Sequence, residues 1–421
     1  MVVFLLVLVV VLALLGAVHW YVWRRLVRDV TVRGSLPRRL GTVAVVVLPL
    51  LSFAALASSR AGAPFVLQQV VAWPGFLWLA LLLYVTLALV VGEAVRPVLR
   101  AWLTRRAHRA AAEVTVPVPQ PVPAPAEGAA GPASAGAVEE APAVSDVSRR
   151  LFVSRVVGGA AAAAAVGTVG FGTYGVLRGP RIKRVTVPLA KVPRAAHGYR
   201  IAVVSDIHLG PILGRAHTQR IVDTINSAQP DLIAVVGDLV DGTVENLGSA
   251  AEPLARLRAR HGSFFVTGNH EYFSGADAWV DHVRELGLRP LRNDRVEIAA
   301  GFDLAGVDDV AGESEGQGPD FVRALGDRDR ARAAVLLAHQ PIVVHDAVRH
   351  GVDLQLSGHT HGGQLWPGNF LAELANPTVA GLERYGDTQL YVSRGAGAWG
   401  PPVRVGAPSD ITIVELASKQ A

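Results

Sequence analysis

The chain has 421 residues and no cysteine, and 51% of its residues are hydrophobic, which is a high share for a protein that is soluble throughout. The lack of cysteine excludes disulfide bonds and thiolate ligands, so any metal site must use nitrogen and oxygen donors. Residues 1–178 contain 16 arginines and seven acidic residues, whereas residues 179–421 contain 24 lysines and arginines and 28 acidic residues. The positive charge therefore lies beside apolar segments rather than on a folded domain, and we expect no nucleic-acid partner.

Four apolar runs predict transmembrane helices, because about 20 helical residues cross a hydrocarbon core of about 30 Å. A cleaved signal peptide is the alternative for the first run, but no basic segment precedes that run. The fourth run is less hydrophobic, and a buried or surface helix is its alternative; the sequence Ser148-Arg149-Arg150-Leu151-Phe152 before it resembles a twin-arginine export signal. The four runs are residues 2–23, 40–58, about 68–92 and 152–177.

The arginines predict the orientation of these helices, since cytoplasmic loops are enriched in positive charge. Segments 24–39 and 96–109 hold six and five arginines and are expected to be cytoplasmic loops, while the loop after the second helix carries only Arg60. Alternation then places the part that follows the fourth helix outside the cytoplasm. Residues 113–147 contain seven prolines, which favour an extended linker. The expected organisation is a three-helix transmembrane region at 1–112, a Pro/Ala-rich linker at 113–150, a fourth transmembrane helix with a twin-arginine-like signal at 151–179 and a folded domain at 180–421.

From residue 200 onward, short β-branched runs alternate with segments of helical periodicity. This alternation predicts an α/β domain, with a site built on the loops at the strand ends. The predicted helical segments are 216–228, 249–260, 275–286 and 319–331. The predicted strands are Ile201–Val204, Leu232–Val236, Ser263–Val266, Asp303–Val307, Ala334–Ala338, Val352–Leu356 and Gln389–Ser393.

A cluster of polar residues follows five of these strands. Each cluster alone is a weak signal, but their order and their common place at strand ends indicate one site. Aspartate, histidine and asparagine donors suit Mn, Fe or Zn. Two such metals about 3.5–4 Å apart can bind both the attacking and the leaving oxygen of a displacement at phosphorus. The clusters are Asp206-Ile207-His208, Gly237-Asp238-Leu239-Val240-Asp241, Gly268-Asn269-His270-Glu271, His339-Gln340-Pro341 and Gly358-His359-Thr360-His361-Gly362-Gly363.

The five clusters resemble the calcineurin-like metallophosphoesterase superfamily over roughly residues 185–416. The last cluster, together with Gly381–Tyr385 and Leu390–Gly395, resembles a membrane-associated bacterial branch of that superfamily. The resemblance implies a four-layer α/β/β/α sandwich preceded by an α-helical transmembrane region. It also implies a phosphohydrolase, expected to be a phosphodiesterase, in which a metal-bridging hydroxide attacks a phosphate ester. The membrane anchor favours a lipid-type or cell-envelope substrate.

The same resemblance implies the role of each residue in the clusters. His270 would stabilise the phosphoryl group and protonate the leaving oxygen, and Asp241 would orient that histidine, since a carboxylate partner favours the imidazolium. Two divalent metal ions, Mn, Fe or Zn, would be bound. The first would be held by Asp206, His208 and His361, the second by Asn269, His339 and His359, and Asp238 would bridge the two.

Other interpretations stay open at the level of sequence. The metal site could be structural, in a non-catalytic sensor or scaffold at the membrane, or the first three helices could form a transporter or partner-binding module. A nuclease is disfavoured by the acidic catalytic half, and no protein partner is indicated. Trp366 and Trp399 are expected either to line a cleft or to pack. Surface positions are expected for His217, His345 and His350, and a place behind the ligands for Glu271.

Overall fold

The computed structural model describes residues 2–114 and 146–420, so most of the predicted linker at 113–150 lies outside the described residues. The chain divides into two compact units. One unit combines Met1–Val47 with Leu82–Val166, and the other combines Leu48–Leu81 with Gly167–Ala421. The second unit therefore contains both the sheets and a helical segment from the N-terminal half.

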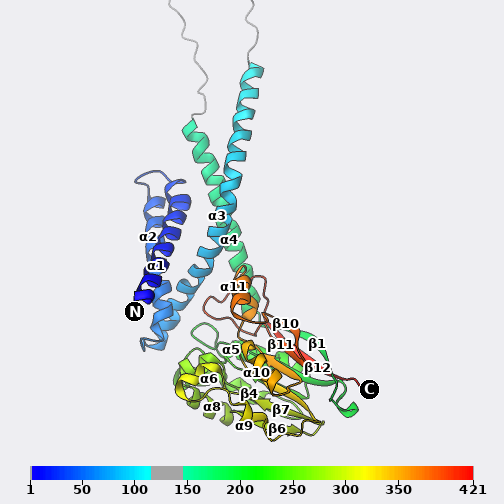
Figure 1. The fold of residues 1–421 in the computed structure, drawn as a ribbon. Helices are drawn as coiled ribbons and strands as arrows, with labels where there is room; N and C mark the ends of the chain where they lie inside the picture. The colour runs from blue at the N-terminus through cyan, green and yellow to red at the C-terminus, as the bar shows by residue number, and fades with distance from the viewer. Residues whose placement is uncertain (1, 115–145, 421) are drawn as a thin grey trace, which may run out of the picture. The chain divides into compact units, whose positions relative to one another are not determined.

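Four long helices precede the sheets (Figure 1). Each contains a segment long and apolar enough to cross a membrane, which agrees with the four predicted runs. A short π-helix, Arg24–Arg28, follows the first of them. The helices are α1 Val2–Trp23, α2 Leu36–Ser58, α3 Phe65–Val114 and α4 Asp146–Leu177.

The third helix is longer than the sequence predicts. An end near residue 92 and an arginine-rich loop at 96–109 are expected, but α3 continues to Val114. The residues beyond the predicted end are mainly arginine, alanine and leucine, which propagate a helix once it has begun. These arginines therefore lie on a helix, and the prediction of a loop at 96–109 is wrong.

Two six-stranded sheets form the C-terminal domain (Figure 1). The first has the order β1-β12-β2-β3-β4-β5, and the second has the order β10-β11-β9-β8-β7-β6. Strands β2, β3 and β4 run parallel to one another, as do β7, β8 and β9. The strands are β1 Arg181–Leu189, β2 Tyr199–Val204, β3 Leu232–Val236, β4 Ser263–Val266, β5 Arg289–Pro290, β6 Asp294–Ile298, β7 Phe302–Gly306, β8 Ala333–Leu337, β9 Leu354–Ser357, β10 Gly381–Tyr385, β11 Thr388–Val392 and β12 Asp410–Ser418.

The core residues lie in layers that follow the alternation of side chains along each strand. In β2, Ile201 and Val203 join the cluster that includes residues of both sheets, while Ala202 and Val204 join the cluster that packs helices on the first sheet. A third cluster packs helices on the outer face of the second sheet. The predicted four-layer α/β/β/α sandwich is confirmed. The first sheet is covered by α5 Arg215–Ser227, α6 Val244–Ala251 and α8 Ala276–Glu285, and the second by α9 Phe321–Leu325 and α10 Val344–Arg349.

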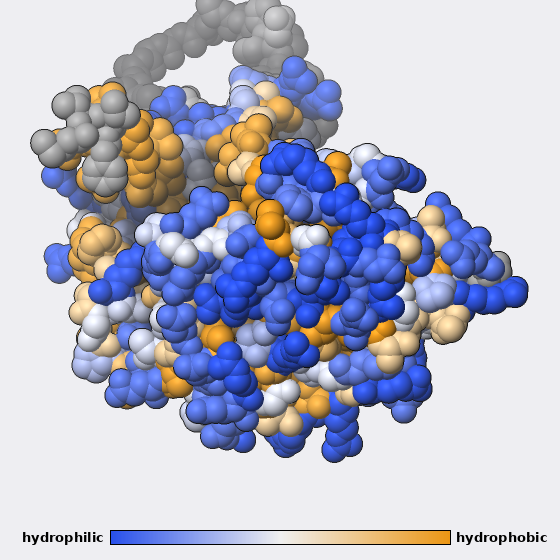
Figure 2. Space-filling model, turned by 60° about the horizontal axis from the view of Figure 1, so that its bottom comes forward, coloured by the Kyte–Doolittle hydropathy of each residue, from blue (hydrophilic) through white to orange (hydrophobic). Residues whose placement is uncertain are grey.

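Two predicted helical segments are shorter in the structure. Segment 249–260 contains the end of α6 and a 3₁₀ turn that stops at Arg256, with Pro253 in its first positions. Segment 319–331 contains only α9, which ends before Gly326. Over the face of the C-terminal domain drawn in Figure 2, hydrophilic residues predominate and hydrophobic residues form scattered patches, as is usual for a domain in water.

Trp279 of α8 is the largest side chain fully buried in the described residues, and its indole nitrogen donates a hydrogen bond to the carbonyl of Gly242 at 2.8 Å. We predict that Trp279→Ala lowers the free energy of unfolding by about 3–5 kcal/mol, because a cavity replaces the ring. Val322→Ala, at a position that is 71% exposed on α9, should change it by less than about 0.5 kcal/mol. Chemical denaturation of the full chain in detergent, followed by intrinsic fluorescence, measures the free energy of unfolding of both variants. Equal losses of this free energy in the two variants would contradict the assigned core.

Candidate metal centre

All the predicted metal ligands lie just beyond the carboxyl ends of strands. Parallel strands present these ends at one edge of a sheet, so the loops that follow them converge. The two sheets together supply the ligands. Asp206 and His208 follow β2, Asp238 follows β3, Asn269 begins α7 (Asn269–Ser274) after β4, His339 follows β8, and His359 and His361 follow β9.

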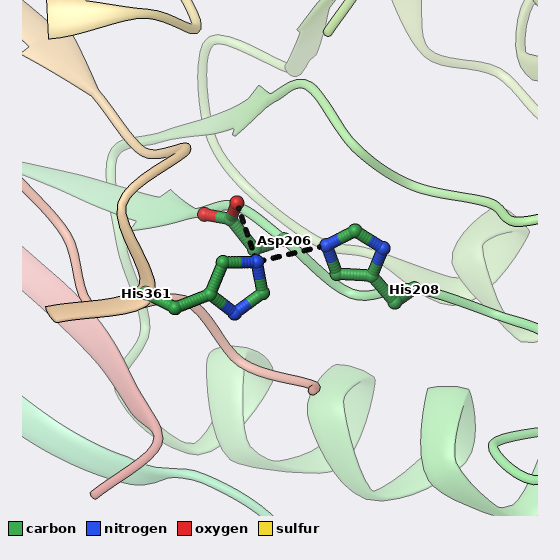
Figure 3. A group of neighbouring side chains, drawn as sticks. All are labelled: Asp206, His208 and His361. Atoms are coloured by element: carbon green, nitrogen blue, oxygen red, sulfur yellow. Dashed lines mark hydrogen bonds and ion pairs between the residues drawn. The ribbon is translucent and has the colours of Figure 1, made fainter. Parts of the chain in front are cut away.

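Asp206, His208 and His361 form the first group of side chains, drawn in Figure 3. The Nε2 atom of His361 lies 3.4 Å from Oδ1 of Asp206 and 3.0 Å from Nε2 of His208. All three side chains are buried. One atom from each residue thus points to a common centre, and this is the set that the sequence assigns to the first metal.

Asp238, His339 and His359 form a second group with ligand-type atoms close together. The Nε2 atom of His339 lies 3.1 Å from Oδ2 of Asp238, and Nδ1 of His359 lies 3.0 Å from Oδ1 of Asn269. Oδ2 of Asp238 is also 3.8 Å from Nε2 of His208 in the first group. The carboxylate of Asp238 therefore lies between the two groups.

Asp241 contacts two histidines. Its Oδ1 atom is 2.6 Å from Nδ1 of His270 and 3.1 Å from Nδ1 of His208. Burial by itself lowers the pKa of His270, but the hydrogen bond and the charge of Asp241 outweigh burial and raise that pKa to about 9. Burial raises the pKa of Asp241, but the two histidines outweigh it and hold the pKa at about 2. The pair therefore favours an imidazolium beside an ionised carboxylate.

The residues present fit divalent cations. The side chains of Asp206 and Asp238 are 0% and 2% exposed, and buried carboxylates need positive partners. Burial raises the pKa of Asp206. Although His339 Nε2 is near Asp238, it is a buried atom that makes no aligned hydrogen bond in the described residues, and the Nε2 atoms of His208 and His361 face each other. Nitrogen and oxygen donors around shared centres are the ligands that Mn, Fe and Zn accept.

The backbone at the site is strained. Eight non-glycine residues among those described have positive φ, and five of them are candidate ligands. Such conformations cost of order 1–3 kcal/mol each for a non-glycine residue and gather at functional sites. The folded structure therefore maintains them for the side-chain placement they give. The five are Asp206, His208, Asp238, His359 and His361, with φ between 50° and 73°.

Two glycines leave room for the carboxylates. A Cβ atom added at Gly358 would collide with the side chains of Asp206 and Ser205, and one added at Gly268 would collide with the side chain of Asp238. The atoms that would be met also include Cβ of Ser205 at 2.6 Å from the first position and the backbone nitrogen of Asp238 at 2.5 Å from the second. The glycines beside the ligands are therefore needed for close packing of the ligand loops.

Two supporting residues are given little or no role by the sequence. Glu271 is fully buried and accepts hydrogen bonds from the backbone amides of Asp238, Leu239 and Gly268 at 2.6–2.9 Å, which ties two ligand loops together. Arg404 is 5% exposed, donates to the carbonyl of His361 at 3.0 Å and places Nη2 3.1 Å from Nδ1 of that histidine. The only sequence signal for Arg404 is a lone arginine between two valines.

The other residues weighed in the sequence lie as follows. His217 is buried at 1% exposure on α5, so its predicted surface position is wrong; burial lowers its pKa to about 3 and keeps it neutral. His345 is exposed on α10 and His350 is partly exposed at its end, in keeping with a surface position. The ring of Trp399 meets that of His270 edge to face at 5.8 Å, and Trp399 lines a cavity of about 500 Å³ beside the metal centre.

Residues 199–363 match the family model of calcineurin-like phosphoesterases. A zebrafish (Danio rerio) protein named transmembrane protein with metallophosphoesterase domain is 39% identical over 264 residues, which cover 60% of this chain and 60% of that protein. An uncharacterized metallophosphoesterase of Aquifex aeolicus is 35% identical over 243 residues, which cover 57% of this chain and 92% of that protein.

The chain belongs to the calcineurin-like metallophosphoesterase family. Its match spans somewhat more than half the length of the first curated relatives, 60% for the zebrafish protein and 57% for a bovine one. The membrane association expected from the sequence agrees with the names of these two relatives and with the apolar helices. The relatives come from animals as well as bacteria, so the resemblance is not confined to a bacterial branch.

We predict that Gly358→Ala reduces the metal content of the purified full-length chain severalfold, because the added methyl group displaces the carboxylate of Asp206. Gly214→Ala is the matched control, since a Cβ atom there meets nothing within 4 Å. Elemental analysis after removal of loosely bound metal, with circular dichroism to compare folding, measures both variants. Equal metal content in two equally folded variants would contradict the placement of Asp206 in the centre.

Proposed function

We propose that this protein is a dinuclear metal-dependent phosphohydrolase that acts on phosphodiesters. The observation that carries the proposal is the position of Asp238 between two groups of metal-type ligands, with the His270–Asp241 pair beside them. Family membership supports the reaction class. When bound, two divalent cations supply Lewis-acid chemistry that acidifies a water molecule and neutralises charge on the phosphate.

The residues of this chain bind the cations and transfer the proton. Asp206, His208 and His361 hold one cation, Asn269, His339 and His359 hold the other, and Asp238 serves both. His270 donates the proton of its imidazolium to the leaving oxygen as the bond from phosphorus to that oxygen breaks. The attacking water supplies the new oxygen on phosphorus and releases a proton to solvent, and uptake of a proton from solvent restores the imidazolium. Asp241 accepts the hydrogen bond from Nδ1 of His270, which keeps the Nε2 proton available for transfer.

A diester substrate fits the surroundings of the centre better than a monoester. The cavity beside the ligands, about 500 Å³, has room for an ester group on each side of the phosphorus.

The membrane half supports a further part of the proposal. Four apolar helices suit a multi-pass protein, with the C-terminal domain from about residue 180 on the extracytoplasmic side, as the distribution of arginines favours. The twin-arginine-like sequence, which lies in the first turns of α4, would then serve export of that domain. A catalytic domain that faces outward would act on phosphate esters of the membrane surface or the cell envelope.

Turnover of bis-4-nitrophenyl phosphate and 4-nitrophenyl phosphate by the full chain in detergent, with Mn, Zn, Fe or no metal, tests the reaction. We expect metal-dependent turnover that favours the diester. Asp238→Asn and His270→Ala should each lower kcat by about 10²–10⁴-fold, the usual contribution of such groups.

Two substitutions outside the centre serve as controls. Asp387→Asn changes a fully exposed aspartate in the turn between β10 and β11, and His345→Ala changes an exposed histidine on α10; both should leave kcat unchanged. If the wild-type protein is folded and metal-loaded but turns over neither ester, the phosphohydrolase proposal fails and a sensor or scaffold takes its place.

The His270–Asp241 pair also predicts a pH dependence. The pKa of His270 is raised, so the imidazolium acts as an acid at low pH and the rate is lost as pH rises through that pKa. Asp241→Asn removes the carboxylate that raises the pKa, so the alkaline limb of the kcat profile should move to lower pH. A diester with a phenolate leaving group, which needs the proton, is the substrate to use. An alkaline limb that stays in place would exclude His270 as the acid.

A further inference from the structure

The cavity beside the metal centre is not walled by the C-terminal domain alone. Its lining includes His208, Asp238 and His270. It also includes residues from the end of α2, the turn that follows it and the beginning of α3, segments that belong to the same compact unit as the sheets. These are Ala55, Leu56, Ser59, Arg60, Gln68 and Phe76.

Direct contacts hold this helical hairpin together and against the domain. The hydroxyl of Ser52 donates to the carbonyl of Gly75 at 2.7 Å, which joins α2 to α3. Phe65, the first residue of α3, packs against the core cluster on the helical face of the first sheet. The ring of Phe76 lies beside Gly400, 3.7 Å from the point where a Cβ atom would stand. The hairpin therefore forms part of the cavity wall and is packed against the domain.

The cavity has a mixed chemical character. Carboxylates and imidazoles of the candidate metal centre line part of it, and Leu56, Phe76 and Trp399 add an apolar wall. Leu56 is 43% exposed and Trp399 is 52% exposed, so large apolar surfaces remain uncovered beside a polar site. Leu56 also belongs to a helix with the length and composition of a membrane span.

Arg60 adds a cation to the same wall. Its side chain is exposed, and it makes no hydrogen bond or ion pair with any residue in the described ranges 5–109 and 149–420. A guanidinium without a carboxylate partner, in a cavity also lined by the candidate metal centre, suits an anionic ligand such as a phosphate. A purely hydrocarbon ligand would leave this guanidinium without an anionic partner.

We propose that the substrate is an amphiphilic phosphate diester from the lipid surface. Its phosphate lies at the metal centre, Arg60 contacts its anionic head, and its hydrocarbon chain lies along Leu56 and Phe76. The proposal rests on the phosphohydrolase function above and assigns a substrate class to that site. A small water-soluble diester would leave the apolar wall empty and would gain nothing from the hairpin.

Two substrates that differ only in chain length test the proposal: methyl 4-nitrophenyl phosphate and dodecyl 4-nitrophenyl phosphate. The full chain is reconstituted in lipid nanodiscs with metal, and kcat/KM is measured for both diesters. The ratio of the two values, dodecyl over methyl, is compared among the wild type, Leu56→Gln, Arg60→Gln and Arg60→Lys. Phe53→Gln is the matched control, because Phe53 lies on the same helix, is 72% exposed and does not line the cavity.

We expect the ratio to fall at least about tenfold in Leu56→Gln, mainly through KM for the dodecyl diester, because only that substrate has a chain to lie along Leu56. Arg60→Gln should lower kcat/KM for both diesters, since both carry the phosphate charge, and Arg60→Lys should recover part of that loss. Phe53→Gln should keep the wild-type values. A dodecyl preference that Leu56→Gln shares with the wild type would reflect partition into the bilayer and would overturn the proposal. If the wild type turns over neither diester, the phosphohydrolase function itself fails, whereas turnover of both with an unchanged ratio overturns only the substrate class.

A binding experiment gives an independent result. A dodecylphosphonate with a diazirine at the end of its chain is photolysed with the metal-loaded His270→Ala variant in nanodiscs, and the labelled peptides are identified by mass spectrometry. The proposal is supported if residues 48–81 are labelled and if Leu56→Gln reduces that labelling. Labels that fall only outside this segment would overturn it.

Discussion

Two carboxylates buried at the meeting point of two sheets set the main constraint on this structure. Asp206 and Asp238 are almost without solvent contact, and a buried charge is tolerated only beside compensating partners. Backbone amides provide part of the compensation: the amide of His359 donates to Asp206, and the amide of His270 donates to Asp238. The facing imidazoles provide another part, and the donor set leaves a place for cations. The ligand loops, the glycines beside them and the strained backbone all serve this arrangement.

The supporting residues explain how loops from separate strands keep a common geometry. Glu271 accepts three backbone amides from the loops after β3 and β4, so it fixes the position of Asp238 relative to Asn269. Burial and the nearby charge of Asp238 raise the pKa of Glu271 to about 7. Arg404 holds the loop after β9 of the second sheet in place in a similar way, because its side chain donates hydrogen bonds to the carbonyls of His361, Ala407 and Gly397. Hydrogen bonds of this kind hold the candidate metal ligands in place although their backbone conformations are strained.

The candidate metal centre and the α2–α3 hairpin line the same cavity. The proposed catalytic groups would supply chemistry that many phosphate esters undergo, so selectivity would come from what surrounds them. In this chain the surroundings include an apolar wall and the exposed guanidinium of Arg60. The hairpin would thus be more than an anchor: it would select the substrate that the metal centre hydrolyses.

Among the described residues, the sequence by itself determined seven of the twelve strands and the order of the ligand clusters, but it did not predict β1, β5, β6, β10 or β12. β3 and β4 have the predicted bounds, because an apolar β-branched run that ends at glycine or a polar cluster is a local signal. It also determined the four apolar helices, which depend on length and hydropathy alone. Only the tertiary structure decided that Asp238 lies between two ligand groups, that His217 is buried and that Arg404 supports His361, since each depends on segments far apart in the chain. The same holds for the wall formed by Leu56, Arg60 and Phe76, because no local pattern relates a membrane helix to a loop more than 150 residues away.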